Sequence, residues 1–341
     1  MNILIIKLSA IGDVAQCQPF LEALRRTYPQ ARLTWLVEEA ASDIVLDHSQ
    51  IDRVLVSHRK SWIREIKKGR IRSTIKEIRL FLKDLRSEKY DLVIDLQGLF
   101  KSGIFAFLSG GRQKVGFDRS RELSYLFYNR RMEPYNIDQH ALLRYLDVAA
   151  LLGAEVDKNV KFCLPRNDDA AHRAEQMLAG SGKPKVVLNP VARWTTKLWP
   201  RESWKELIRR MSRELDIQVV LTGGPQDRAF NREIFQGSHG ALDVTGQTSL
   251  KVLMEIFRSA DLVVCPDTGP MHLAAGVGVP VVALFGPTAP WRTGPFGPGH
   301  LVLRRELECS PCFRKSCPDP KCMTELSVDE VYEAVRTRLE L

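Results

Sequence analysis

Two short polar motifs, one toward each end of the chain, combine residue types that can do chemistry. Ser9-Ala10-Ile11-Gly12-Asp13 follows the first apolar run, and Asp267-Thr268-Gly269-Pro270-Met271-His272 follows a late one. The first offers a carboxylate, Asp13, beside Gly12, which lets a ligand approach the backbone. The second offers a helix start, which attracts anions. In an α/β protein both would lie at the carboxyl ends of strands, where ligands bind.

Each motif also has a purely structural interpretation. An aspartate is ionised at neutral pH but is a weak base unless its position favours proton transfer. Aspartate is also favoured as a helix cap, and residue type alone favours that role for Asp13. In the second motif, Asp267 or Thr268 can cap a helix and Pro270 suits its first turn without any ligand. As a site, this helix start would hold a phosphate, and His272 would donate to phosphate or ribose.

Two further loops follow predicted strands in the second half of the chain. The loop 189–200 contains Thr195, Thr196 and Lys197, which can present two hydroxyls and an ammonium to a diphosphate. Gly223 and Gly224 end the next strand and would let the backbone approach a nucleotide. Together, these strand ends favour a ligand crevice more strongly than any one of them does.

Several common site motifs are absent from the sequence. It contains no P-loop, no Gly-x-Gly-x-x-Gly, no Asp-x-Asp and no Gly-x-Ser-x-Gly. These absences argue against P-loop phosphoryl transfer, a dinucleotide cofactor, a metal on paired carboxylates and a serine hydrolase.

The composition is typical of a soluble globular protein of two domains. The chain has 341 residues, of which 44% are hydrophobic and 27% charged. No apolar run is long enough to span a bilayer. The start, residues 1–6, lacks a charged region and a cleavage site, so it is expected to be a buried strand rather than a signal peptide. These features predict a cytoplasmic protein.

The net charge of +9 is concentrated in one segment. Residues 59–86 contain eleven Lys or Arg and three Asp or Glu, an excess of +8 (11 − 3). One interpretation is a solvated helix face, because the segment also carries an apolar stripe at helical spacing. The other is a patch for an anionic partner: a membrane surface, a phosphorylated lipid or nucleic acid. The stripe consists of Ile71, Ile75, Ile78 and Leu82.

Seven cysteines fall into two groups. Cys17, Cys163 and Cys265 lie in apolar stretches and are predicted to be small core residues. The other four cluster near the C-terminus, which in a cytosolic protein favours a metal site over disulfides. Their spacing matches no standard zinc or iron–sulfur pattern, so a structural zinc and reduced thiols in a proline-rich loop both stay open. They are Cys309, Cys312, Cys317 and Cys322.

Apolar strand patterns alternate with amphipathic helix patterns along the chain, which predicts parallel sheets with right-handed crossovers. A helix-cap signal at 165–168 marks the expected boundary between a domain of residues 1–165 and one of residues 166–325. Residues 326–341 are expected to form a helix that packs back on the first domain. Predicted strands are 3–8, 33–37, 53–56, 92–96, 186–188, 218–221, 262–265 and 279–285; predicted helices are 19–28, 142–152, 202–214, 250–257 and 328–339.

Three segments resemble the bacterial lipopolysaccharide heptosyltransferases, the ADP-heptose glycosyltransferases of family 9. They are Lys7–Val14, Asp95–Ser102 and Pro266–Ala274, and the resemblance runs over essentially the whole chain. Arg121–Arg130 looks like the heptosyltransferase I subfamily, which acts on an inner-core Kdo sugar. The four-cysteine cluster looks more like heptosyltransferase II and other members. Val191 stands where relatives often carry glycine, and an extra residue precedes Lys197.

The resemblance implies a GT-B fold, two Rossmann-like domains with parallel sheets facing a central cleft. It implies inverting transfer of L-glycero-D-manno-heptose from ADP-heptose to Kdo of Kdo2-lipid A, at the cytoplasmic face of the inner membrane. No cofactor, no catalytic metal and no nucleic acid partner are expected. Asp13 would be the general base, and Lys197 would stabilise the leaving diphosphate.

The resemblance also implies a binding role for further residues. The N-terminal domain would hold the anionic acceptor and the C-terminal domain the donor. Acceptor binding is implied for Ser9, Arg59, Lys60, Arg64, Lys101 and Arg121. Donor binding is implied for Gly12, Thr195, Thr196, Lys197, Gly223, Gly224, Asp267, Thr268, Gly269 and His272.

Three alternative functions stay open. The chain could be heptosyltransferase II or another family 9 sugar transferase. A GT-B nucleotide-sugar epimerase would use the same fold but would need no lipid-facing basic patch. A nucleic-acid-binding protein would use the basic segment but would leave the helix-start motifs unexplained.

Overall fold

The computed structural model describes residues 1–341 except 119–120, 134–135, 158–161, 237–240, 341 and the side chain of Arg121. The chain divides into two compact units, Met1–Val160 and Lys161–Leu341. The second unit begins earlier than the expected boundary at 165/166. The reason is local: Phe162 and Leu164 are buried, and the Leu164 N–H donates to the Gly276 carbonyl at 2.6 Å.

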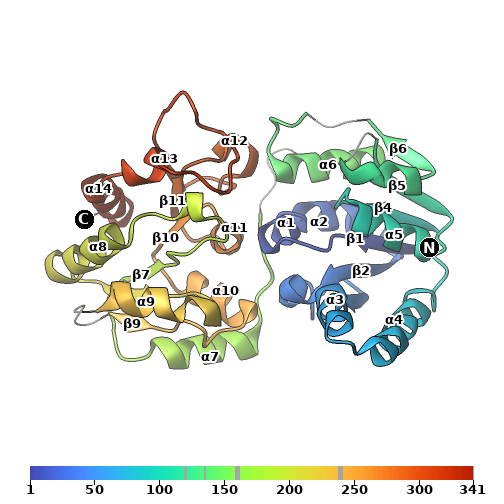
Figure 1. The fold of residues 1–341 in the computed structure, drawn as a ribbon, viewed down its shortest axis with the longest axis horizontal. Helices are drawn as coiled ribbons and strands as arrows, with labels where there is room; N and C mark the ends of the chain where they lie inside the picture. Colours follow the sequence, from blue (N-terminus) through green and yellow to red (C-terminus); the bar gives the residue numbers. More distant parts are fainter. Residues whose placement is uncertain (119–120, 134–135, 158–161, 237–240, 341) are drawn as a thin grey trace. The chain divides into compact units, whose positions relative to one another are not determined.

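The first unit is built on a parallel sheet of six strands (Figure 1). Ile3, Leu4, Ile5 and Ile6 of the first strand are fully buried, as expected for a sheet covered on both faces. The sheet order is β3-β2-β1-β4-β5-β6. The strands are β1 (Asn2–Ile6), β2 (Arg32–Glu38), β3 (Arg53–Ser57), β4 (Leu92–Asp95), β5 (Gln113–Phe117) and β6 (Arg130–Met132).

Helices cover both faces of this sheet. Phe105 and Leu85 pack with Leu4 and Ile6 on one face, and α2 packs against α6. The helices are α1 (Ile11–Ala15), α2 (Gln18–Thr27), α3 (Arg59–Lys67), α4 (Ile71–Leu85), α5 (Phe100–Leu108) and α6 (Ala141–Leu151), with the 3₁₀ segments η1 (Glu39–Ile44) and η2 (Arg121–Phe127).

The second unit repeats this plan with six parallel strands in the order β12-β11-β10-β7-β8-β9. The strands are β7 (Lys185–Leu188), β8 (Gln218–Leu221), β9 (Leu242–Asp243), β10 (Leu262–Pro266), β11 (Val281–Phe285) and β12 (Leu301–Arg304). The helices are α7 (Asp168–Leu178), α8 (Arg201–Glu214), α9 (Arg228–Phe235), α10 (Leu250–Arg258), α11 (Gly269–Gly276), α12 (Pro290–Thr293), α13 (Lys321–Thr324) and α14 (Val328–Leu339), with the 3₁₀ segments η3 (Thr195–Lys197) and η4 (Pro225–Asp227).

Both sheets reverse their strand order at one point. In each unit the first three strands in sequence are added one after another from the centre of the sheet toward one edge. The next three are added from the centre toward the other edge. The reversals lie between β1 and β4 and between β7 and β10, and ligands of such sheets bind outside the carboxyl ends of these strands. The motifs at 9–13, 189–200 and 267–272 follow β1, β7 and β10, and the segment Asp95–Ser102 follows β4, so the fold places these four at reversal points. Gly223 and Gly224 follow β8, one strand away.

Helix α14 packs within the second unit. Val331, Tyr332 and Val335 lie in one core with Trp204 of α8, and the Tyr332 hydroxyl donates to Glu214 at 2.9 Å. This differs from the predicted packing on the first domain, because the apolar side of the helix is used in the core of the second unit.

One cysteine prediction is also wrong. Cys17 and Cys265 are fully buried, but Cys163 is exposed. Its neighbours Phe162 and Leu164 both point inward, and alternate side chains of an extended segment point to opposite sides. Among the described residues, no helix is long and apolar enough to cross a membrane.

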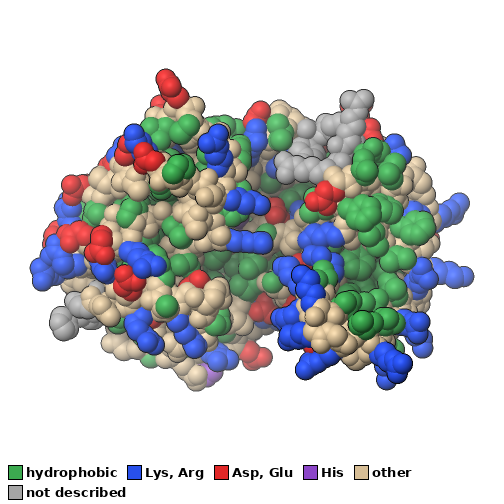
Figure 2. Space-filling view, in the orientation of Figure 1, with side chains coloured by type: hydrophobic (Ala, Val, Ile, Leu, Met, Phe, Trp, Pro, Cys, Tyr) green, Lys and Arg blue, Asp and Glu red, His purple; other side chains and the backbone are tan. Residues whose placement is uncertain are grey.

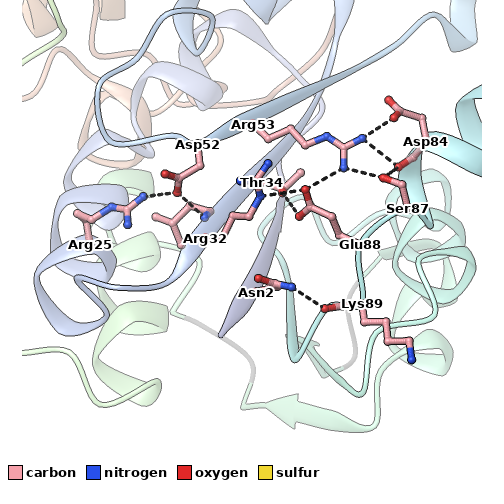
Figure 3. A network of polar contacts seen from close by, with 11 residues as sticks. Asn2, Arg25, Arg32, Thr34, Asp52, Arg53, Asp84, Ser87, Glu88 and Lys89 are labelled. Atoms are coloured by element: carbon pink, nitrogen blue, oxygen red, sulfur yellow. Dashed lines mark hydrogen bonds and ion pairs between the residues drawn. The ribbon is translucent and has the colours of Figure 1, made fainter.

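A polar network closes the amino-terminal edge of β1–β3 (Figure 3). Arg53 of β3 forms an ion pair with Asp84 near the end of α4, and its Nη1 lies 3.2 Å from Glu88. The Nε atom of Arg32 in β2 lies 2.9 Å from the same glutamate. The end of α4 is therefore fastened to the edge of the sheet opposite to the polar motifs.

His48 predicts a pH dependence of stability. Its side chain is buried, with Nε2 2.9 Å from Gln18 Oε1 and Nδ1 accepting the Gln50 N–H at 3.1 Å. Burial lowers the pKa of His48 to about 4. An unfolded histidine has a pKa of about 6.5. Between about pH 6.5 and pH 4 the unfolded chain therefore binds more protons than the folded chain, so stability falls as the pH falls through this range.

We expect this histidine to account for a loss of about 3 kcal/mol of unfolding free energy between pH 7.5 and pH 4. Urea unfolding of the wild type and His48→Gln at several pH values measures the effect. The variant should lack this part of the pH dependence, and identical pH profiles for the two proteins would refute the assignment.

Candidate active site

Asp13 lies in the first turn of α1, just past β1. Its Oδ2 accepts the N–H of Ala10, the N-cap residue, at 2.9 Å. It is therefore not the N-cap itself but the residue that reaches back to it, as in a capping box. Within the described part of the chain, the other oxygen, Oδ1, accepts no hydrogen bond. The structural role thus occupies one oxygen and leaves the second for a substrate proton.

A buried lysine, Lys7, lies close enough to Asp13 to interact with it electrostatically. Its Nζ donates to the Tyr145 hydroxyl at 2.7 Å and to the Leu96 carbonyl at 3.2 Å. Burial alone would lower the pKa of Lys7, but Tyr145 and Asp13 outweigh burial and raise that pKa. Lys7 is therefore a fixed cation that joins the end of β1 to the loop after β4, a role its sequence position did not reveal.

Three of the predicted acceptor residues converge on Glu38, the last residue of β2. Its Oε1 lies 3.0 Å from Arg59 Nη2 and 3.2 Å from Lys101 Nζ, and its Oε2 lies 3.2 Å from Lys60 Nζ. The Lys101 ammonium also donates to the Ser9 hydroxyl at 3.0 Å. The structure therefore brings Ser9, Arg59, Lys60 and Lys101 together at one strand edge.

The charge of this cluster favours an anionic ligand. Burial alone would raise the pKa of Glu38, but Arg59 and Lys101 outweigh it and lower that pKa, so the carboxylate is ionised. Three cations around one anion leave a net charge of +2 (3 − 1). Glu38 is a positioning residue that sequence reasoning missed, although it is the polar residue that ends an apolar strand.

One other predicted acceptor residue, Arg64, is not part of this cluster. Arg64 interacts with Glu65 and Ser61 instead, and 65% of its side chain is exposed. The side chain of Arg121 lies outside the described residues, so its role stays a prediction.

The loop after β4 is held by Asp95. Its Oδ1 accepts the Gln97 N–H at 2.8 Å and the Gly98 N–H at 3.1 Å, and its Oδ2 accepts the Tyr128 hydroxyl at 2.7 Å. Gly98 has φ +64°, a conformation that favours glycine. Because Gln97 Oε1 accepts the Ser9 N–H at 3.0 Å, the two loops at this reversal point form one surface.

At the corresponding edge of the second unit, Lys197 and Asp267 form an ion pair. Lys197 Nζ lies 2.6 Å from Asp267 Oδ2, and the Thr288 hydroxyl donates to the same oxygen at 2.6 Å. Asp267 is 5% and Thr288 6% exposed, so the carboxylate is nearly enclosed. Asp267 thus holds the ammonium in place. Thr288, in the loop after β11, was not predicted.

Thr195 and Thr196 make contacts that differ from their predicted role. Thr195 Oγ1 donates to the Lys315 carbonyl at 3.1 Å, and Thr196 Oγ1 donates to the Arg314 carbonyl at 2.8 Å. A hydroxyl has one proton, and an ionised phosphate oxygen can only accept. While these bonds persist, neither threonine can donate to a diphosphate. The two hydroxyls instead fasten the Lys197 loop to the segment 309–322.

Helix α11 begins just past Asp267. Thr268 is its N-cap residue, but the Thr268 side chain makes no capping hydrogen bond. The first-turn N–H groups of Gly269 and its neighbours lack helical acceptors, as at any helix start. A helix start without a side-chain cap beside a lysine suits an anion. His272, one turn in, is 7% exposed.

Two of the remaining predicted donor residues, Gly223 and Gly224, lie in a tight turn after β8. The Gly223 carbonyl accepts the Gly246 N–H at 2.8 Å, and the Gly224 N–H donates to Asp227 Oδ2 at 2.8 Å. A Cβ atom on Gly223 would lie 3.1 Å from Asp227 Cβ, a tight contact, so the turn leaves little room for a side chain. Gly12 is buried at the start of α1 in the first unit. Nucleotide contact by these glycines stays a prediction.

All four thiols of the cysteine cluster are free, and the described residues include no group of three or more His, Cys, Asp or Glu side chains arranged to hold a metal ion. A structural zinc at this cluster stays a prediction. Burial and the neighbouring Cys312 raise the pKa of Cys322, which keeps it a thiol. The Cys312 N–H donates to the Pro287 carbonyl at 3.0 Å, so the segment is tied to the loop that carries Thr288.

Comparisons of the sequence and of the structure with known proteins point to the same family. Residues 78–323 match the model of glycosyltransferase family 9 (heptosyltransferase). The chain is 32% identical over 324 residues to lipopolysaccharide heptosyltransferase 1 of Pseudomonas aeruginosa, which covers 93% of this chain and 87% of that protein. It is 30% identical over 317 residues to the protein of the same name in Escherichia coli K12, covering 90% and 95%. The structure of E. coli heptosyltransferase WaaC with ADP matches with a TM-score of 0.80 and 27% identity over 99% and 100% of the two chains.

Proposed function

Since this chain belongs to glycosyltransferase family 9, we propose that it is a lipopolysaccharide heptosyltransferase, which moves L-glycero-D-manno-heptose from ADP-heptose to Kdo of Kdo2-lipid A with inversion at the anomeric carbon. The similarity to proteins named lipopolysaccharide heptosyltransferase 1 supports the reaction class. The observation that supports the acceptor most directly is the net positive cluster around Glu38, which contacts Ser9 in the loop just before α1, the helix that carries Asp13.

The first unit supplies the acceptor side of the reaction. Arg59, Lys60 and Lys101 bind the carboxylates and phosphates of the acceptor, because they are held together with a net positive charge. Asp13 Oδ1 takes the proton of the acceptor hydroxyl. The hydroxyl oxygen then forms a bond to the anomeric carbon as the bond from that carbon to the ADP oxygen breaks, and the electron pair leaves with ADP.

The second unit supplies the donor side. Lys197 and the first turn of α11 stabilise the negative charge that develops on the diphosphate, because a fixed ammonium and a helix start need no reorganisation during the reaction. Asp267 and Thr288 keep the ammonium in place. We propose that these groups make a divalent metal unnecessary.

The test is transfer from ADP-heptose to Kdo2-lipid A by the purified protein, with and without EDTA. Equal transfer in both conditions supports the proposed acceptor and the metal-independent mechanism. Binding of ADP-heptose without transfer would instead favour heptosyl-Kdo2-lipid A as acceptor, the substrate of a later heptosyltransferase. Loss of transfer in EDTA that is restored by a divalent cation would contradict the role given to Lys197 and α11. Failure to bind ADP-heptose would contradict the donor.

The hydrogen bond between Thr196 and Arg314 gives a prediction for donor affinity. Thr196→Val keeps the shape of the side chain but leaves the Arg314 carbonyl without its donor. A bond of this kind is worth about 0.5–1.5 kcal/mol, so we expect a Kd for ADP-heptose about three- to tenfold weaker. Thr196→Ser keeps the hydroxyl and is the matched control. Calorimetric titration measures both, and equal affinity in the valine variant would show that the bond does not position Lys197.

A further inference from the structure

We propose that the first unit carries a docking surface for a bilayer that contains anionic lipids. The α3–η2 surface consists of exposed apolar side chains on α3, α4, α5 and η2 and of the lysines and arginines beside them. The proposal extends the proposed function, whose acceptor is a lipid, but the surface itself is argued from exposure and charge alone. The apolar members are Ile63, Ile66, Ile71, Ile75, Leu80, Phe100, Phe107, Leu123 and Leu126.

The exposed apolar side chains are concentrated. Nine of the fourteen large hydrophobic residues that the described chain exposes lie between residues 63 and 126. Phe107 is 61% exposed, Leu126 62%, Leu123 56% and Ile71 51%. Single exposed hydrophobic residues are normal, but a contiguous group marks a binding surface.

Aromatic contacts beneath the exposed side chains pack the four elements against one another. Trp62 of α3 contacts Phe81 of α4 with ring centroids 5.3 Å apart, and Phe81 contacts Phe105 of α5 at 5.7 Å. Phe127 of η2 lies 5.4 Å from Phe100, at the other end of α5. Figure 2 shows hydrophobic side chains gathered over the region of α4 and α5, with lysines and arginines around them.

Helix α4 presents an apolar stripe and a cationic stripe side by side. Ile71, Ile75, Ile78 and Leu82 recur at helical spacing, and Arg72, Lys76, Arg79 and Lys83 follow each of them by one position. One residue turns a helix by about 100°, so the cations lie next to the apolar stripe rather than opposite to it. The apolar stripe divides along the helix: Leu82, near its end, packs on the core beside the buried Leu85, whereas Ile71 and Ile75, in the first half, are exposed.

The four cations of this stripe are available to a ligand. In the described part of the chain none of them forms an ion pair or a hydrogen bond. The acid nearest the end of the helix, Asp84, is paired with Arg53 at the edge of the sheet (Figure 3). The helix therefore shows its positive charge outward and keeps part of its negative charge against the sheet.

An anionic bilayer fits this surface better than other partners do. Its headgroups pair with the cations while its acyl chains take up the isoleucines and phenylalanines. A nucleic acid would leave the apolar side chains in water. A second copy of the same surface would bring two strongly positive segments together. Because α3 also carries Arg59 and Lys60 of the Glu38 cluster, the docked surface continues into the proposed acceptor site.

The test is sedimentation with vesicles that contain neither donor nor acceptor, so its outcome does not depend on the transferase assignment. Vesicles of phosphatidylcholine alone are compared with vesicles that also contain phosphatidylglycerol. We expect binding to the anionic vesicles only, weakening as salt rises. Both the apolar variant Ile71→Ser/Ile75→Ser/Phe107→Ser and the charge variant Lys76→Gln/Lys83→Gln should bind at least tenfold more weakly. The matched control is Leu151→Ser/Arg213→Gln, an exposed apolar residue and an exposed cation outside the surface.

The outcomes separate the alternatives. Wild-type binding in both the charge variant and the apolar variant, or equal binding to both kinds of vesicle, would overturn the proposal. So would a concentration-dependent dimer that the apolar variant abolishes, or displacement of the protein from vesicles by duplex DNA. Circular dichroism confirms that each variant is folded. In detergent micelles of Kdo2-lipid A the variants should transfer heptose at the wild-type rate, which separates docking from catalysis.

Discussion

Asp13→Asn is expected to lower kcat for heptose transfer by about 10³-fold while leaving the Kd for ADP-heptose within about threefold of the wild type. The amide has the shape of the carboxylate, and its oxygen can still accept the Ala10 N–H that Asp13 Oδ2 accepts at 2.9 Å. The start of α1 therefore keeps its cap. An amide oxygen cannot take the proton of the acceptor hydroxyl, so the expected loss falls on the chemical step. Single-turnover kinetics with saturating acceptor measures it.

Asp13→Ala is the matched comparison, because it removes both the base and the cap. We expect it to lose as much activity as the asparagine variant and also some stability, by about 1 kcal/mol. Near-wild-type turnover in Asp13→Asn together with a loss in Asp13→Ala would reverse the assignment. It would mean that the carboxylate acts only as a cap, the role that residue type alone favours.

The strands buried on both faces were the easiest to predict from sequence, although the edge strand β3 was predicted as well. β1, β4, β7 and β10 are runs of apolar residues, and all four were predicted with small shifts at their ends. β6, β9 and β12 lie at sheet edges, where half-exposed residues give a weak apolar signal, and they were missed together with β5. The strands beside the reversal points are buried ones, which is why the motifs after β1, β7 and β10 could be assigned to strand ends from sequence.

The candidate site was harder to predict because its supporting residues are far apart in sequence. Glu38 and Lys101 are brought together only when β2 and β4 flank β1. Thr288 contacts Asp267 for the same reason, across β10 and β11. The residue types at strand ends were a usable signal, and applying it to every strand would have found Glu38.

Thr195 and Thr196 show a second reason why residue type alone does not establish a binding role. A hydroxyl beside a lysine in a loop is equally suited to a phosphate and to a backbone carbonyl. The partner that decides between them, the segment around Arg314, lies over a hundred residues further along the chain. No local pattern contains that information.

Lys197→Met is expected to reduce kcat by about 10²- to 10³-fold, the usual cost of losing one group that stabilises developing negative charge. Methionine keeps much of the length of the lysine stem and loses the ammonium. However, the variant also leaves the nearly enclosed Asp267 carboxylate with Thr288 but without its cation, which destabilises the folded chain. Low activity alone would therefore not tell a catalytic cation from a structural one.

The double variant Lys197→Met/Asp267→Asn separates the two roles. It removes the unpaired charge, so we expect unfolding free energy to return toward the wild-type value while kcat stays low. Denaturant unfolding and steady-state transfer kinetics on the same preparations measure the two quantities independently. If the double variant instead regained turnover, Lys197 would serve only to neutralise Asp267, and the diphosphate would depend on the start of α11 for its stabilisation. A low kcat in a fully stable double variant is the result that assigns the leaving-group cation to Lys197.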